Sequence, residues 1–203
     1  GDLCRSRSSG PPCMTVQLDL LRHGETEIGG FRGSLDDALT PLGWAQMRGA
    51  VTGAGPWQRI VSSPLQRCAR FAEELAARLQ LPLTLEPGFQ ELHFGAWEGR
   101  SAAQLMATDE AGLGLFWNDP YAFTPPEAEP VTEFRTRVLA ALARLQQACA
   151  GERVLLVSHG GVMRLLLAQA RGLPREQLLQ VEAGHGALFS LQVGAGCTLR
   201  EVR

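Results

Sequence analysis

The chain of 203 residues contains no lysine, so arginine carries its permanent positive charge, and the formal net charge at pH 7 is −2. A near-neutral chain without a basic stripe is not typical of proteins that bind nucleic acid. No apolar stretch approaches the roughly 20 residues that a membrane-spanning helix needs. We therefore expect neither nucleic acid nor a membrane among the partners of this protein.

Cysteine is scarce, and the five cysteines present are scattered along the chain. They show neither the CxxC spacing of a zinc site nor the pattern of a disulfide framework, so we expect no bound metal. This scatter favours reduced thiols and a cytoplasmic location. Residues 1–13 are rich in serine, glycine and proline and lack the apolar core of a secretory signal. We interpret them as a flexible leader, followed by a single domain at 14–203.

Short apolar runs alternate with segments of helical periodicity after this leader. Strands that alternate with helices predict an α/β fold, a three-layer sandwich in which a mainly parallel sheet carries helices on both faces. An irregular stretch at 108–130, within a cap or lid segment at about 101–130, interrupts the pattern. The predicted strands are 16–21, 59–62, 83–85 and 154–157, the helices are 41–53, 64–79, a short one after 101, 132–151 and 161–170, and 187–193 with 198–202 form a terminal hairpin.

Side chains that cap helices predict where three of these helices begin. Ser63 and Gln66 have the spacing of a capping box, and so do Ser101 and Gln104. Thr132 is expected to cap the long helix that follows. Such caps bind the N–H groups that the first helical turn leaves without partners.

Two histidines follow strands, each directly before a glycine. Arg22 and His23 end the first strand, and Ser158 and His159 end the fourth. In open α/β sheets, ligands bind beyond the carboxyl ends of the strands. An imidazole there can be aimed at a ligand, and the adjacent arginine offers a fixed set of donors suited to phosphate. Two such histidines are hard to explain by packing alone.

Two further candidates are expected on the same rim of the sheet. Arg67 lies one turn into the helix after the second strand, and Glu91 follows the third strand. Arginines and helix N-terminal amides can bind the non-bridging oxygens of a phosphomonoester. A neutral imidazole can attack phosphorus, and a carboxylic acid can protonate the leaving group. This set suits phosphoryl transfer and requires no metal or other cofactor.

Four motifs in one order closely resemble the histidine phosphatase superfamily, which includes the cofactor-dependent phosphoglycerate mutases. The resemblance extends from about residue 16 to the last strand, nearly the whole domain. The motifs are Leu-Arg-His-Gly-Glu-Thr at 21–26, Ser-Ser-Pro-Leu-Gln-Arg at 62–67, Glu91 ahead of Phe-Gly-Ala-Trp-Glu-Gly at 94–99, and Ser-His-Gly-Gly at 158–161.

The resemblance implies a role for each candidate residue. His23 would be the nucleophile that forms a phosphohistidine, and Glu91 would be the acid and base. The phosphate pocket would be formed by Arg22, Arg67, His159 and Gly160.

The sequence also favours one branch of this family. Mutases carry Trp-Asn shortly after the His-Gly-Glu motif, where this chain has Glu27-Ile28-Gly29. The segment 32–40 looks most like the α-ribazole phosphatases of cobalamin biosynthesis. That branch implies hydrolysis of α-ribazole 5′-phosphate or a similar small phosphomonoester, with release of inorganic phosphate. The alternatives are a broad-specificity sugar-phosphate phosphatase, a phosphoglycerate mutase, and a catalytically inactive phosphate-binding module.

Two positions depart from the pattern of that branch. His93 stands where many of these phosphatases have an acidic residue, and Gly184-His185-Gly186 replaces the asparagine and small hydroxyl residues often found there. We interpret both histidines as structural or as part of the pocket edge.

The remaining carboxylates and aromatic side chains receive structural interpretations. Only motif position separates Glu91 from Glu86 and Glu98, and Glu98 is interpreted as a solvated loop carboxylate. Glu25 is expected to be structural or orienting. The aromatic side chains at 116–123 belong either to the core or to a lid that faces the substrate.

Overall fold

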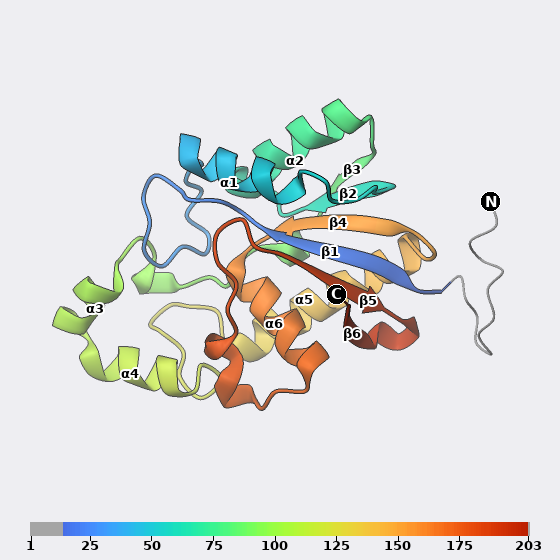
Figure 1. Ribbon diagram of the computed structural model, residues 1–203. Coiled ribbons are helices and arrows are strands. Elements are labelled where there is room, and N and C mark those ends of the chain that lie inside the picture. The colour runs from blue at the N-terminus through green and yellow to red at the C-terminus, as the bar shows by residue number, and fades with distance from the viewer. Residues whose placement is uncertain (1–13, 203) are drawn as a thin grey trace.

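The computed structural model describes residues 14–202, which form one mixed sheet of six strands in the order β3-β2-β4-β1-β5-β6 (Figure 1). Neighbouring strands from β3 to β1 are parallel, and β5 is antiparallel to both β1 and β6. The predicted strands and the terminal hairpin are confirmed, whereas the predicted leader at 1–13 lies outside the described residues. The strands are β1 (Val16–Arg22), β2 (Arg59–Ser62), β3 (Leu83–Leu85), β4 (Arg153–Ser158), β5 (Leu188–Val193) and β6 (Leu199–Val202).

Helices cover both faces of the sheet, so the predicted three-layer α/β sandwich is confirmed (Figure 1). Successive side chains of a strand point to opposite faces. In β4, Val154 and Leu156 therefore pack in one core, whereas Leu155 and Val157 pack in the other. The two helices on the first face are α5 (Val131–Ala148) and α6 (Gly160–Arg171), and those on the second face are α1 (Pro41–Val51) and α2 (Gln66–Leu79).

The predicted capping box of α2 is wrong. The helix begins at Gln66, and no side chain of its N-cap residue, Leu65, bonds its first turn. Asp36 from a distant loop accepts a hydrogen bond from the Gln66 N–H at 2.7 Å instead. The Ser63 hydroxyl lies 2.8 Å from a ring nitrogen of His159. Ser63 thus makes a tertiary contact with His159 instead of the helix cap that its spacing predicted.

The segment at 108–130 is more regular than the sequence predicted. It contains α4 (Glu110–Asn118), which Asp109 caps by accepting a hydrogen bond from the Gly112 N–H at 3.0 Å. Its glycines lower helix propensity, but Leu113 and Phe116 are buried and stabilise the helix from the core side. The capping box of Ser101 and Gln104 that starts α3 (Ala102–Thr108) is confirmed. The predicted Thr132 cap is wrong, because α5 begins at Val131 and its N-cap residue is Pro130.

Helices α3 and α4 lie beyond the carboxyl end of β1, off the sheet (Figure 1). Phe116 joins them to the core, because its ring packs against Phe31, Phe94 and Trp97 with centroid separations of 6.5, 6.1 and 5.6 Å. Within residues 14–202 no helix is long and apolar enough to cross a membrane. Among the described residues, four short 3-10 helices complete the fold: η2 (Pro87–Phe89), η3 (Gly95–Trp97), η4 (Arg175–Gln180) and η5 (Ala195–Cys197).

Candidate active site

The register of the sheet brings the two strand-end histidines together. Arg22 at the end of β1 pairs with Ser158 at the end of β4, so the residues that follow leave the sheet side by side. The His23 N–H also donates to the Ser158 carbonyl at 3.1 Å. The rings of His23 and His159 lie edge to face, with centroids 5.4 Å apart. The predicted meeting of these two residues on one rim is therefore observed.

The position of His23 defines which of its nitrogens is available. The ring is 2% exposed, and Nδ1 lies 2.8 Å from the Gly24 carbonyl oxygen. A carbonyl can only accept, so this bond places the proton on Nδ1 and the lone pair on Nε2. Burial, and then the charge of Arg67, hold the pKa of His23 well below its usual range. The imidazole is therefore neutral and nucleophilic at Nε2 near neutral pH.

His159 is enclosed by β2 and α2. It is fully buried, and its Nε2 forms a 2.8 Å hydrogen bond with the hydroxyl of Ser63, the residue that follows β2. The thiol of Cys68 lies 3.7 Å from the same nitrogen. Burial and the charge of Arg67 hold the pKa of His159 well below its usual range. The sequence motif predicted a histidine in the pocket but not the Ser63 contact that orients it.

Arg67 is a fully buried arginine in the first turn of α2. Its guanidinium donates to the carbonyl oxygens of Leu35 at 2.5 Å and Gly33 at 3.0 Å. Asp37 lies 3.5 Å away and balances part of its charge. Arg67 is therefore not an ordinary exposed arginine of a helix surface.

Glu98 binds the backbone at residues 33–35, which Arg67 also contacts, so the interpretation of Glu98 as a solvated carboxylate is wrong. Its side chain is only 16% exposed. It accepts hydrogen bonds from the N–H groups of Gly33 at 2.9 Å, Ser34 at 2.8 Å and Phe94 at 3.0 Å. Although partial burial opposes the shift, these hydrogen bonds lower the pKa of Glu98. Glu98 thus fixes the backbone whose carbonyl groups bind Arg67.

Arg22 lies against the N-terminus of α6. A Cβ atom built on Gly160 would lie 3.0 Å from the Arg22 Cζ and 2.8 Å from Nη1 of Arg164, so a larger residue there would displace these guanidinium groups. One Arg22 nitrogen donates to the Ala183 carbonyl at 2.5 Å. Burial and the neighbouring Arg164 lower the pKa of Arg22 to about 10, which leaves it charged at neutral pH.

Three guanidinium groups in this region have buried Nε atoms without a hydrogen-bond partner among the described residues. They belong to Arg22, Arg32 and Arg67. The charges of all three contribute to the low pKa of His23, so the groups lie near its ring. A buried donor without a partner carries a free-energy cost unless a ligand supplies an acceptor. The arrangement is that of a site for an oxygen-rich anion.

Glu91 faces the N-terminus of α6 from the loop after β3. One carboxylate oxygen accepts from the Leu92 N–H and the other from the Gly161 N–H, both at 2.9 Å. A Cβ atom on Gly161 would lie only 2.1 Å from the first of these oxygens. Glu91 and Arg22 therefore contact neighbouring glycines of the same helix turn. The structure places Glu91 beside the predicted phosphate pocket.

Glu86, another candidate for the acid and base, differs from Glu91 in the contacts of its carboxylate. Glu86 caps η2 by accepting from the Gly88 N–H at 2.9 Å and pairs with Arg144 at 2.8 Å. Arg137 of α5 donates to the carbonyl oxygens of Gln90 at 2.8 Å and Glu91 at 3.1 Å. The chain around Glu91 is thus held in place while its carboxylate stays at the rim.

Sequence reasoning missed Arg32 and assigned His185 only a structural role or a place at the pocket edge. The Arg32 side chain is 9% exposed and lies 3.8 Å from Asp37, with its Nε among the unpartnered donors. The ring of His185 lies 5.7 Å from that of His23, between centroids. The sequence signal for Arg32 is weak, because it consists only of the general preference of phosphate-binding sites for arginine. His185 reaches the rim because β5 is antiparallel, so residues before β5 meet those after β1.

His93 and Glu25, the other two residues discussed from the sequence, contact nearby loop residues. His93 is exposed, and its Nδ1 lies 2.5 Å from the Ser34 hydroxyl and 3.3 Å from Glu98. Glu25 accepts a hydrogen bond from the Thr40 N–H at 3.0 Å through its backbone carbonyl. In the part of the chain that the structure describes, no group of three or more histidine, cysteine or carboxylate side chains is placed to hold a metal ion.

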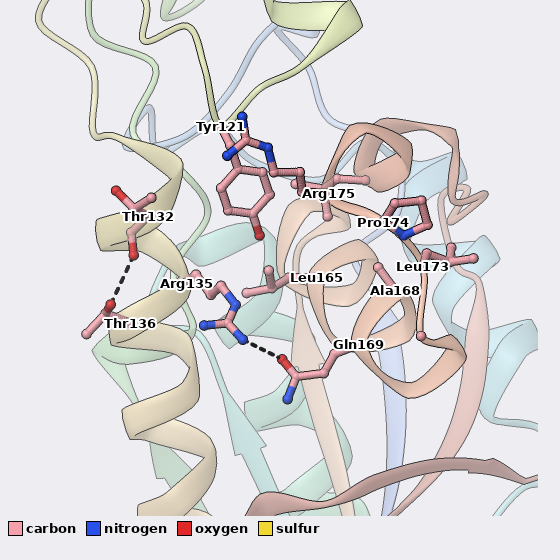
Figure 2. Close-up of a pocket in the computed structure, with 12 residues that line it drawn as sticks. Tyr121, Thr132, Arg135, Thr136, Leu165, Ala168, Gln169, Leu173, Pro174 and Arg175 are labelled. Atoms are coloured by element: carbon pink, nitrogen blue, oxygen red, sulfur yellow. Dashed lines mark hydrogen bonds between the residues drawn. The ribbon is translucent and has the colours of Figure 1, made fainter.

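A cleft of about 630 Å³ lies between α5 and α6 (Figure 2). Arg135 of α5 donates to Gln169 of α6 at 3.3 Å, and Arg175 pairs with Asp119 at 2.7 Å. The ring of Tyr121 reaches into the cleft between them (Figure 2). None of the candidate catalytic residues lines this cleft, so we place the chemistry at the sheet rim despite the size of the cleft.

Comparison with known proteins agrees with this geometry. The family model of the histidine phosphatase superfamily (branch 1) matches residues 18–201. The adenosylcobalamin/alpha-ribazole phosphatase of Escherichia coli (strain K12) is 30% identical over 183 residues, which cover 88% of this chain and 90% of the relative. A probable phosphoglycerate mutase of Escherichia fergusonii is 33% identical over 164 residues, covering 78% of this chain and 76% of the relative.

Solved structures show the same relationship. A mycobacterial glucosyl-3-phosphoglycerate phosphatase superposes with a TM-score of 0.80 at 27% identity and covers 93% of this chain and 96% of that one. The resemblance predicted from the four sequence motifs is confirmed. Because the family model extends over nearly all of the described sheet and helices, this chain belongs to the histidine phosphatase superfamily and is a phosphatase.

Proposed function

We propose that this protein hydrolyses a small phosphomonoester through a phosphohistidine at His23. The observation that carries the proposal is the set of three unpartnered buried guanidinium Nε atoms, on Arg22, Arg32 and Arg67, around a neutral imidazole. A phosphoryl group has three non-bridging oxygens that accept hydrogen bonds. Such donors stabilise the negative charge of the transition state without having to reorganise.

In the first step the lone pair of His23 Nε2 attacks phosphorus, and the bond from phosphorus to the leaving oxygen breaks. The bond from Nδ1 to the Gly24 carbonyl keeps that lone pair directed away from the backbone. It also stabilises the positive imidazole ring that results from phosphorylation. Glu91, as a carboxylic acid, gives its proton to the leaving oxygen.

In the second step a water molecule attacks the phosphohistidine. Glu91, now a carboxylate, takes a proton from that water, the bond from phosphorus to Nε2 breaks, and inorganic phosphate leaves. The N–H groups of Leu92 and Gly161 hold the Glu91 carboxylate in one orientation during both steps. Atoms and protons balance, and the enzyme returns to its starting state.

We propose α-ribazole 5′-phosphate as the leading substrate. The support is the similarity over 88% of this chain to the adenosylcobalamin/alpha-ribazole phosphatase of Escherichia coli. Other relatives act on other monoesters: a glucosyl-3-phosphoglycerate phosphatase and a probable phosphoglycerate mutase match at comparable identity. A sugar-phosphate phosphatase is therefore the second candidate and a mutase the third. A cap at 101–130 that covers the substrate is part of the same proposal.

A cytoplasmic location is also a proposal. The three cysteines among residues 14–202, Cys68, Cys149 and Cys197, are free thiols. Burial raises the pKa of Cys68 to about 12 and raises those of the other two, so all three are poor nucleophiles. Unpaired thiols are typical of proteins in a reducing compartment.

Activity on p-nitrophenyl phosphate tests the mechanism directly. We expect His23→Ala to lower kcat/KM by about a thousandfold or more, because alanine has no nitrogen that can form the covalent intermediate. Acid-labile phosphate should be trapped on the wild type and not on His23→Ala. As a matched control, Arg70→Ala on α2 changes an exposed arginine that pairs with Glu73, and it should retain activity.

The outcomes separate the candidate functions. Equal rates for wild type and His23→Ala would contradict the covalent mechanism. No rate from either protein, with phosphate still bound, would favour a phosphate-binding module. The value of kcat/KM on α-ribazole 5′-phosphate against a panel of sugar phosphates ranks the substrates. Isomer formation from 3-phosphoglycerate in the presence of a bisphosphate primer would identify a mutase.

A further inference from the structure

A third imidazole stands beside the proposed nucleophile. The centroid of His185 lies 5.7 Å from that of His23, with the two rings tilted by 39°. The centroid of His159 lies 5.4 Å from that of His23, but Nε2 of His159 is already bonded to Ser63. No hydrogen bond involves the ring of His185 among the described residues, and the side chain is exposed. Its ring nitrogens are therefore available to a ligand.

The backbone holds His185 in this position. The Gly186 N–H donates to the carbonyl oxygens of Arg22 at 3.2 Å and His23 at 3.4 Å, and the Ala187 N–H closes a turn onto Gly184 at 3.0 Å. Gly186 has a φ of +72°, a conformation that glycine adopts without strain. The turn that carries His185 is thus bonded to the end of β1 that carries the nucleophile. An exposed side chain on a fixed turn is well suited to contact a substrate.

We propose that His185 donates a hydrogen bond to a non-bridging oxygen of the phosphoryl group transferred to His23. This inference rests on the proposed function. Because the ring centroids are only 5.7 Å apart, the N–H of His185 could reach a phosphoryl group on Nε2 of His23. His185 would then be a catalytic residue that touches the phosphoryl group in the covalent intermediate and in the transition states on either side of it.

The surrounding charges explain why an imidazole suits this place. Partial desolvation, followed by the charges of Arg22 and Arg32, lowers the pKa of His185 to about 4, so the ring is neutral at neutral pH. A neutral imidazole still offers one N–H donor. It adds a hydrogen bond without adding another cation beside three guanidinium groups, so it does not further disfavour a positive imidazole on phosphorylated His23.

Binding of inorganic phosphate, followed through the ring resonances of isotope-labelled histidine, tests this proposal alongside kinetics on p-nitrophenyl phosphate. We expect His185→Ala to weaken phosphate binding and lower kcat/KM by roughly ten- to a hundredfold, the range for a hydrogen bond to a charged group. His185→Asn places an amide N–H near the position of Nδ1 and should restore most of both. Gln180→Ala, an exposed substitution on η4, should change neither.

Each result decides a different question. If His185→Ala binds phosphate and turns over substrate within about twofold of the wild type, the proposal is overturned. If neither His185→Asn nor His185→Gln, whose amide lies near the position of Nε2, recovers activity over His185→Ala, the ring acts through shape and not as a donor, which also overturns it. If the wild type binds phosphate without hydrolysis, the proposed function fails, while phosphate affinity of the variants still tests the contact.

Discussion

At the scale of single residues, the chemistry depends on which atoms of a side chain already have partners. His23 and His159 are both buried, neutral and next to a strand end. The Gly24 carbonyl occupies Nδ1 of His23 and leaves Nε2 free, whereas Ser63 occupies Nε2 of His159. Two residues of the same type therefore present different atoms to a ligand. The same reasoning separates Glu91 at the rim from Glu86, whose carboxylate is taken by Arg144.

The close approach of Gly161 to Glu91 gives a test at this scale. A methyl group in Gly161→Ala would lie 2.1 Å from a Glu91 oxygen, and the flexible carboxylate would move more easily than the backbone. We expect at least a tenfold loss of kcat/KM on alkyl phosphates, toward the roughly hundredfold value of a lost general acid, and a smaller loss on p-nitrophenyl phosphate. The free energy of unfolding should change by less than about 1 kcal/mol.

Gly49→Ala is the matched control. Gly49 is also helical, but a Cβ atom there meets nothing within 4 Å. It should raise stability by up to about 1 kcal/mol and leave both activities unchanged. If Gly161→Ala lowered kcat/KM equally for alkyl phosphates and for p-nitrophenyl phosphate, Glu91 would not be the group that protonates the leaving oxygen.

At the scale of elements, the loop between β1 and α1 is shaped by partners from elsewhere in the chain. Glu98 next to η3 binds the N–H groups of Gly33 and Ser34, and Arg67 of α2 binds the Gly33 carbonyl. Asp36 of this loop in turn caps α2. The loop has little regular secondary structure, but these hydrogen bonds hold its backbone in place. We therefore propose that Glu98 is a positioning residue that affects phosphate binding through Arg67.

The variant Glu98→Gln tests this positioning role. The amide keeps the shape but loses one acceptor oxygen and the negative charge, so the 33–35 backbone should loosen. We expect the KM for p-nitrophenyl phosphate and the inhibition constant of phosphate to rise by about tenfold, with stability lower by about 1–3 kcal/mol. A fall in kcat with unchanged phosphate affinity would contradict the route through Arg67.

Glu74→Gln serves as the control for that experiment. Glu74 pairs with Arg48 at 3.0 Å, and both side chains are about half exposed, at 49% and 54%. An exposed pair of this kind contributes roughly 0–1 kcal/mol, so stability should fall little and phosphate affinity not at all.

At the scale of the whole molecule, folding places neutral histidines inside a cluster of arginines. Burial, together with the charge of Arg67, lowers the pKa of both His23 and His159. In the unfolded chain these groups return to a pKa of about 6.5. The unfolded state therefore binds protons below that pH while the folded state does not. Global stability must then depend on pH in the range where histidine titrates.

We expect the free energy of unfolding to be nearly constant above about pH 7.5 and to fall as the pH drops from 7 to 5. Each buried neutral histidine contributes a slope of up to about 1.4 kcal/mol per pH unit. The loss begins at the unfolded pKa and continues down to the lowered folded pKa. Chemical denaturation across this range measures the slope, and His159→Asn should reduce it. An unchanged slope in that variant would show that His159 is protonated in the folded state.

The sequence by itself determined the alternation of strands and helices, the three-layer α/β fold and the strand-end placement of Arg22, His23 and His159. These features depend on local periodicity and on the rule that parallel strands present their carboxyl ends at one rim. Four motifs in one order were also enough to indicate the family.

The tertiary structure alone decided the contacts that make these residues a site. Ser63 has the spacing of a helix cap, yet it orients His159, and Glu98, which reads as a solvated loop residue, organises the support of Arg67. His185 and Arg32 join the site only because β5 is antiparallel and the 32–39 loop folds over α2. Local pattern cannot predict such partners, because hydrogen bonds between distant segments depend on how the sheet brings them together.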